Sequence, residues 1–197
     1  MKKMIAVIAV LAGALLTGAC ADQRDEPAEA FAPTAEQPAK PVRLQWGQPA
    51  TVSGTNGSKL KVTPLGVLYD TGSPDIEPEN GVFVVIALRA EAVDQPETIA
   101  APITGGGFMW QGADAQKISG TEGNAVITPW VGSVNEFSNV PIQTGEPAVG
   151  IETFDVPAKG GRLIYVDPLT AAVTSWELPD RAQGTGLDKV RRTREGG

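Results

Sequence analysis

The feature that most constrains the fold is a run of seven apolar residues at positions 82–88. A run of this length, rich in valine and bounded by turn-forming residues, predicts a strand, and a strand that is apolar on both sides belongs in the middle of a sheet. Because side chains alternate along a strand, one set faces the core. If this set is Val84, Ile86, Leu88 and Ala90, then the set that faces outward is Phe83, Val85, Arg89 and Glu91.

Shorter strand patterns fill most of the middle of the chain. Leu60 and Val62 alternate with polar residues, and the preceding Asn56-Gly57 turn predicts a hairpin with residues 50–52. Further strands are expected at residues 108–111, 125–128, 149–156, 162–166 and 172–178. Proline and glycine interrupt the chain between them. The pattern predicts an all-β protein, an immunoglobulin-like antiparallel β-sandwich of about seven to nine strands.

The composition excludes several classes of site. The 197 residues include no histidine and one cysteine. A serine or cysteine nucleophile therefore has no histidine base, and zinc or an iron–sulfur cluster has no set of thiolates. No internal disulfide can form, which excludes a cysteine-bridged antibody-type domain. The formal net charge of −7 argues against nucleic-acid binding, which needs a basic face.

Residues 1–19 have the pattern of a secretory signal. Lys2 and Lys3 precede an apolar run at residues 4–16, which is shorter than the roughly 20 residues that cross a bilayer. The segment that ends in Thr-Gly-Ala-Cys at Cys20 resembles the lipobox of bacterial lipoproteins. The resemblance implies cleavage before Cys20 and attachment of lipid to it, and hence a protein anchored to the extracytoplasmic face of the cell membrane. The alternative is an ordinary secretory signal with a chance cysteine.

Composition divides the chain into four parts. The signal peptide, residues 1–19, is followed at residues 20–41 by the lipidated cysteine and a tether rich in proline, alanine and acidic residues, which cannot bury enough apolar surface to fold. Residues 42–179 form the β-sandwich domain. Residues 180–197 are a basic tail rich in glycine and arginine, which we expect to be disordered.

The order of motifs in the middle of the chain resembles a family. Gly-Gln-Pro at residues 47–49 leads into short strands and the long apolar strand, and Phe-Asp-Val-Pro at residues 154–157 precedes Leu-Ile-Tyr-Val at residues 163–166. This order resembles the telokin-like, immunoglobulin-fold domains of unknown function in actinobacterial and firmicute lipoproteins. The resemblance implies the fold and supplies no active site. The 23 glycines and 16 prolines, with abundant alanine, are consistent with an actinobacterial source.

Asp70 is the residue that suggests catalysis. The segment Asp70-Thr71-Gly72-Ser73 follows a strand pattern and resembles the catalytic loop of aspartic proteases. That chemistry needs two carboxylates that share one proton, and the chain has one such loop. Asp-Thr-Gly is also a common turn after a strand, and we favour this structural interpretation.

The same loop raises the question of calcium. Its carboxylate and amide side chains are those of Asp70, Asp75, Glu77, Glu79 and Asn80. Carboxylates at alternate positions are typical of the start of a calcium loop. The pattern is incomplete, because asparagine stands at the glycine position and isoleucine where a bidentate glutamate is required. We favour a solvated acidic loop.

The four tryptophans divide into two kinds. Trp46, Trp110 and Trp176 lie on strand patterns and are expected in the core. Trp130 follows a proline at a turn, where an exposed ring could stack on a sugar or on an apolar patch of a partner. Aromatic caps on the ends of a sandwich are commoner, so we favour that interpretation and keep Trp130 as the candidate ligand contact.

Three functions remain open. We favour a non-enzymatic binding domain whose contacts lie in the loops at residues 70–81, 104–107 and 129–147. Its expected partners are membrane lipid, through Cys20, and an unidentified protein or polymer of the cell envelope, with no nucleic acid, cofactor or metal. The alternatives are an accessory lipoprotein that binds a small solute or calcium, and a carboxylate-dependent hydrolase that uses Asp70.

Overall fold

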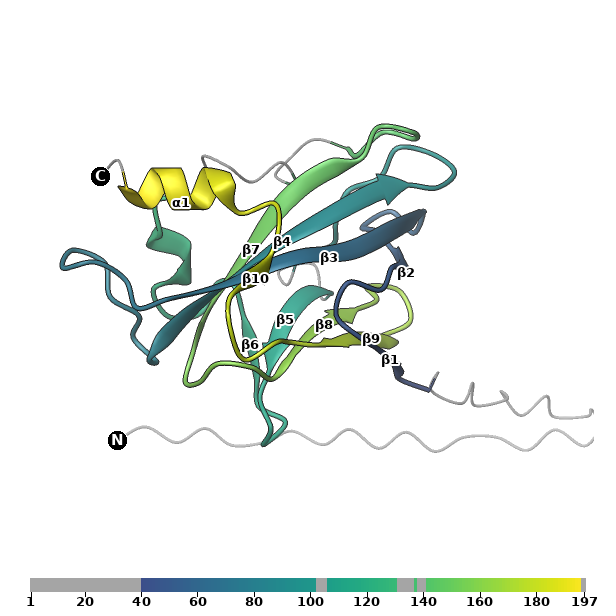
Figure 1. Ribbon diagram of the computed structural model, residues 1–197. Helices are drawn as coiled ribbons and strands as arrows, with labels where there is room; N and C mark the ends of the chain where they lie inside the picture. Colours follow the sequence, from purple (N-terminus) through teal and green to yellow (C-terminus); the bar gives the residue numbers. More distant parts are fainter. Residues whose placement is uncertain (1–39, 102–105, 131–136, 138–140, 196–197) are drawn as a thin grey trace, which may run out of the picture. The chain divides into compact units, whose positions relative to one another are not determined.

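The computed structural model describes residues 40–101, 106–130, 137 and 141–195. The strands of this part form two sheets in which most neighbouring strands are antiparallel. The first sheet has the strand order β1 (Val42–Leu44), β9 (Val173–Glu177), β8 (Arg162–Val166), β5 (Gly107–Gln111), β6 (Lys117–Ser119). The second has the order β10 (Gln183–Gly184), β3 (Lys59–Asp70), β4 (Val82–Ala92), β7 (Ala148–Val156), with β2 (Ala50–Ser53) also paired to β3. The all-β sandwich is confirmed (Figure 1).

The main core lies between the two sheets. Ile86 and Leu88 of β4 meet Leu163 of β8 and Trp176 of β9 in one buried cluster. The core-facing set predicted for the long apolar strand is confirmed, and Trp110 and Trp176 are buried in the same cluster with Trp46 packed against it. Burying so many aliphatic and aromatic side chains is the main stabilising term of the domain.

The strand predictions are mostly confirmed, with three differences. The hairpin of β2 and β3 and the strands near residues 108–111, 149–156, 162–166 and 172–178 are present. The described residues hold ten strands rather than seven to nine, and β1 pairs with β9 in parallel, with Val42 opposite Thr174. Residues 125–128 are not a strand: Ala125–Ile127 form a 3-10 helix, η2, and the hydroxyl of Thr128 donates to Ala125 O at 2.7 Å and closes that turn.

A second apolar cluster lies on the outer face of the β3–β4–β7 sheet. The side chains of Phe83 and Val85, predicted to face outward, are fully buried there. They are covered by Leu187 and Val190, which are also fully buried and belong to the C-terminal segment. The helix α1 (Asp188–Glu195), drawn in yellow in Figure 1, begins directly after Leu187 and includes Val190.

The predicted disorder of residues 180–197, and with it the domain boundary at residue 179, is wrong for residues 180–195. Two glycines permit the close approach of this segment to β3: a Cβ at Gly184, whose φ is +86°, would lie 2.1 Å from Leu65 O, and a Cβ at Gly66 would lie 2.3 Å from Thr185 O. The amide of Thr185 donates to Leu65 O at 3.0 Å. The segment has too few apolar residues to fold alone, and the apolar face of the sheet supplies the partner.

The N-terminal predictions lie outside the described residues. These are the predictions of a signal peptide, of lipid at Cys20 and of a tether up to residue 39. The structure also does not describe residues 102–105, 131–136, 138–140 and 196–197. Within the described ranges, no helix is long and apolar enough to span a membrane.

Candidate functional site

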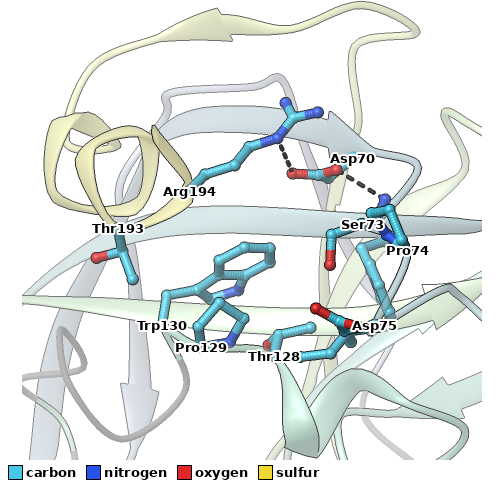
Figure 2. A pocket seen from close by; sticks show the side chains of 12 residues that line it. Asp70, Ser73, Pro74, Asp75, Thr128, Pro129, Trp130, Thr193 and Arg194 are labelled. Carbon is cyan, nitrogen blue, oxygen red and sulfur yellow. Dashed lines mark hydrogen bonds and ion pairs between the residues drawn. The ribbon is translucent and has the colours of Figure 1, made fainter. Parts of the chain in front are cut away.

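A pocket of about 330 Å³ lies where three segments meet: the loop after β3, the residues after η2 and the end of α1 (Figure 2). It is lined by Asp70, Gly72, Ser73, Pro74, Asp75, Ile76, Phe83, Thr128, Pro129, Trp130, Thr193 and Arg194. Both residues singled out by the sequence, Asp70 and Trp130, line this pocket. Volumes of this size are sufficient for a small organic ligand.

Asp70 is the last residue of β3, and its side chain is only 1% exposed. One carboxylate oxygen, Oδ1, accepts a hydrogen bond from the amide of Gly72 at 2.8 Å, which forms the tight turn expected of Asp-Thr-Gly. The other oxygen, Oδ2, is buried and accepts no hydrogen bond from any described residue. A buried carboxylate oxygen without a donor is energetically costly, so this atom is the least satisfied polar group of the site.

The charged neighbour of Asp70 is Arg194, near the end of α1. The Nε atom of Arg194 lies 3.1 Å from Asp70 Oδ2 and forms an ion pair, but its N–H is not directed at the oxygen well enough to make a hydrogen bond. The side chain of Arg194 is 50% exposed. Figure 2 shows it reaching across the upper side of the pocket toward Asp70.

Trp130 forms one wall of the pocket. It is 3% exposed, and its Nε1 donates a hydrogen bond to Thr153 Oγ1 of β7 at 3.0 Å. The ring is therefore not exposed, which was the condition for stacking on a ligand from solvent, and its packing in the second cluster with Phe83 and Val190 agrees with the alternative of an aromatic cap. Its role as a ligand contact stays a prediction, since the ring still borders the pocket.

Asp155, on β7, ties together two segments that contribute walls of the pocket. Its Oδ2 accepts hydrogen bonds from the amides of Glu79 at 2.7 Å and Asn124 at 2.8 Å, and its Oδ1 accepts one from the amide of Asn80 at 2.9 Å. The side chain of Asn124 in turn donates to Glu77 O at 2.9 Å. A fully buried carboxylate with three amide donors is a rigid anchor, so the loop after β3 and the start of η2 are held at a fixed separation.

The acidic loop does not converge on a cation. Asp70 caps its own turn, and Ser73 pairs with Ile76 by two backbone hydrogen bonds. Glu79 and Asn80 use their amides to hold Asp155. Across the described ranges no three histidine, cysteine, aspartate or glutamate side chains are grouped as a metal site. The calcium alternative therefore gains no support from this loop.

The arrangement at Asp70 differs from that of an aspartic protease. That mechanism places a second carboxylate against the first, so that one activates water while the other stays protonated. Here the charged group against Asp70 is a guanidinium. The pair can hold charge and position a polar group, but it does not supply the shared proton.

Sequence reasoning missed Arg194. Its signal was present: Leu187, Val190 and Arg194 are spaced as one face of a helix, which places the arginine beyond two apolar residues. The short helix and the glycines before it concealed this pattern. Two of the loops predicted to make contacts do line the pocket, at residues 70–76 and 129–130. Residues 104–105 and most of 131–140, which belong to the other predicted loops, lie outside the described ranges.

Two glutamates that do not line the pocket are removed from water: Glu97 is fully buried and Glu152 is partly buried. Burial raises the pKa of Glu152, on β7, to about 7. For Glu97, burial would also raise the pKa, but hydrogen bonds from the amides of Thr98, Ser58 and Asn56 outweigh it, and the pKa is lowered. Glu97 thereby fixes the turn at Asn56-Gly57 that joins β2 to β3.

Comparison with known proteins gives a structural likeness. No family model matches the chain, and no curated protein matches it. Among solved structures, the chain is similar to MPT63, a secreted protein from Mycobacterium tuberculosis, with 18% sequence identity and a TM-score of 0.49. The match covers 71% of this chain and 98% of that one. The two sheets and the pocket described above are seen in the strands and side chains of this chain itself.

Proposed function

We propose that the protein is an extracytoplasmic lipoprotein, anchored through Cys20, whose β-sandwich domain binds a small organic ligand without catalysing a reaction. The observation that carries this proposal is the buried Oδ2 of Asp70, which is ion-paired with Arg194 at 3.1 Å but accepts no hydrogen bond from the described residues, and which borders a pocket of about 330 Å³. Ligand pockets commonly combine a mainly apolar lining with a few fixed polar groups.

The composition of the lining supports this proposal. Phe83 and Trp130 supply aromatic surface, and Pro74 and Pro129 supply rigid apolar surface. Asp70 and Arg194 supply the charged groups. The walls are anchored by Asp155, so the pocket is formed before a ligand arrives, which lowers the entropic cost of binding.

The predicted lipid anchor would place the domain at the cell surface. A lipidated Cys20 would hold the domain at the membrane, with residues 21–41 as the connection. Capture of a solute or of a group on an envelope polymer is the task that such a placement serves. Hydrolysis through Asp70 has weaker support, because the charged group in contact with its carboxylate is the guanidinium of Arg194.

Nuclear magnetic resonance of the full-length protein in detergent micelles tests the binding function. A chemically diverse set of small molecules is added to ¹⁵N-labelled protein while the indole N–H resonance of Trp130 is followed, assigned by its loss in Trp130→Phe. The matched control is the indole N–H of Trp110, which donates to Gly160 O at 2.8 Å and does not line the pocket. Saturable shifts at Trp130 alone support the proposal. A set in which no compound shifts Trp130, or in which Trp110 shifts equally, contradicts it.

A further inference from the structure

We propose that the ligand of this pocket carries a cationic group, a guanidinium or an ammonium on an apolar stem, and that Arg194 of the chain's own C-terminal helix occupies the place of that group when the pocket is empty. This inference rests on the proposed function and names the chemistry of its ligand. Arg194 of α1 would then compete with the ligand for the carboxylate of Asp70, and we call it the built-in competitor.

The first argument is the state of Asp70. Its carboxylate is 1% exposed and is fixed at the end of β3 by the hydrogen bond from Gly72 to Oδ1. Oδ2 is buried at the edge of the pocket and accepts no hydrogen bond from the described residues, although Arg194 is ion-paired with it. A cation that donates N–H to this oxygen would satisfy it, and a charge-assisted hydrogen bond is about twice as strong as a neutral one.

The second argument is the imperfect fit of Arg194. Its Nε lies close enough to Asp70 Oδ2 to balance the charge, at 3.1 Å, but does not donate a hydrogen bond to it. Half of the side chain is exposed to water, which screens the ion pair. A guanidinium that is not attached to α1 can turn to present two parallel N–H groups to the carboxylate, which Arg194 does not do.

The helix does not depend on Arg194 for its position. Leu187 and Val190 are fully buried against the sheet, and Arg191 forms its own ion pair with Asp188 at 3.3 Å. Arg194 lies in the last turn and can swing away while these contacts remain. The pocket can therefore exchange its internal cation for an external one without the loss of α1.

The remaining walls favour a cation with an apolar stem. Asp75 adds a second carboxylate to the lining, so the acidic residues outnumber Arg194 there. Phe83 and Trp130 border the same space and supply apolar surface against which a stem can pack. An anionic ligand would meet one guanidinium and two carboxylates, which makes it the weaker candidate.

Three probes of similar shape separate charge from shape: butylguanidinium, its neutral counterpart butylurea, and the anion pentanoate. Each is titrated into the full-length protein in micelles of a non-ionic detergent, which carries no cationic group of its own, with the Trp130 indole resonance as the readout. We expect butylguanidinium to bind about tenfold more tightly than butylurea, and pentanoate to bind more weakly still.

Two variants test the competition. Arg194→Gln removes the internal cation and is expected to tighten butylguanidinium binding about fivefold, because the site no longer has to release its own arginine. Arg192→Gln is the matched control, since Arg192 is an exposed arginine of the same helix that does not line the pocket, and the affinity should not change. Asp70→Asn is expected to weaken binding about tenfold.

The outcomes are distinguishable. If butylurea or pentanoate binds as well as butylguanidinium in both the wild type and Arg194→Gln, the cationic ligand is wrong while the binding pocket stands. If Arg194→Gln leaves butylguanidinium affinity unchanged or lowers it, the built-in competitor is wrong. If neither these probes nor the diverse set shifts Trp130, both the inference and the proposed function fail. Because the arginine variants and the neutral probe do not alter Asp70, these outcomes hold even if Asp70→Asn does not fold.

Discussion

Arg194, in the last turn of the C-terminal helix, lies with its Nε 3.1 Å from Oδ2 of Asp70, the last residue of β3. The carboxylate is buried and the arginine is half-exposed. This ion pair joins residues 180–197, which the sequence predicts to be disordered, to Asp70, which the sequence predicts to form a turn. It also closes one side of the pocket that Trp130 borders.

A double-mutant cycle measures this ion pair. Because Arg194 is half-exposed and water screens its charge, the coupling between Asp70→Asn and Arg194→Gln should be about 1 kcal/mol in the free energy of unfolding. Urea denaturation of the wild type, the two single variants and the double variant gives this value. A coupling of zero would mean that the two side chains do not interact in solution.

Leu187→Ala should destabilise the domain by about 3 kcal/mol, because a fully buried leucine leaves a cavity when it is truncated. Leu169→Ala, at a leucine that is 66% exposed, is the matched control and should change the free energy of unfolding little. Thermal or urea unfolding provides the comparison. Equal effects at the two leucines would contradict the packing of the C-terminal segment on the sheet.

Glu97→Gln should cost about 3 kcal/mol in the free energy of unfolding, because an amide NH₂ would face donors that now point at a carboxylate. The lowered pKa gives this stabilisation a pH dependence: it is complete above about pH 4.5 and is lost as the pH falls through the pKa of the folded state. Unfolding of the wild type and variant at pH 7 and pH 3 measures both effects. The exposed Glu79→Gln is the control. A gap between wild type and Glu97→Gln that does not narrow at pH 3 would contradict the account.

Glu152→Gln should remove a stability loss that the wild type shows near neutral pH. The pKa of Glu152 is about 7 in the folded protein and 4.5 without burial, so the folded state binds the proton more tightly. Stability should therefore fall as the pH rises from about 4.5 to about 7 and level off above it. The absence of histidine leaves few other groups that titrate in this range. Melting temperatures from pH 4.5 to 8.5 provide the measurement, with the exposed Glu146→Gln as control. An identical slope in Glu152→Gln and wild type would contradict the assignment.

Cys20→Ser should move the protein from the membrane fraction to the soluble fraction, because the predicted lipid attaches to the cysteine sulfur. Cell fractionation followed by immunoblotting measures the distribution. Val93→Ser, which introduces the same residue at a position that is 46% exposed and leaves the cysteine in place, serves as the control. Unchanged membrane association of Cys20→Ser would contradict lipid anchoring.

The sequence predicts the sheets better than it predicts what covers them. The apolar run at residues 82–88 correctly indicates a central strand, and its even-numbered side chains are in the main core. Its odd-numbered side chains Phe83 and Val85 were expected to face outward, and they are buried because α1 covers them. An apolar residue on the outward face of a strand is itself a signal for a covering element, and it points to a partner without saying where in the chain it lies.

The candidate site is only partly visible in the sequence. Asp70 and Trp130 stand out by residue type and turn context, but nothing in their spacing indicates that they border one pocket. That proximity depends on Asp155, which joins two loops far apart in the chain, and on α1, which carries Arg194. Contacts of this kind arise from tertiary packing and have no local pattern.

A crystal structure of Arg194→Gln with butylguanidinium tests the central claim most directly. The account predicts a guanidinium in the pocket that donates to Oδ2 of Asp70, with its butyl stem against Trp130 and with α1 still in place over Phe83 and Val85. Electron density for the probe at another surface, or a filled pocket in which the guanidinium points away from Asp70, would contradict it.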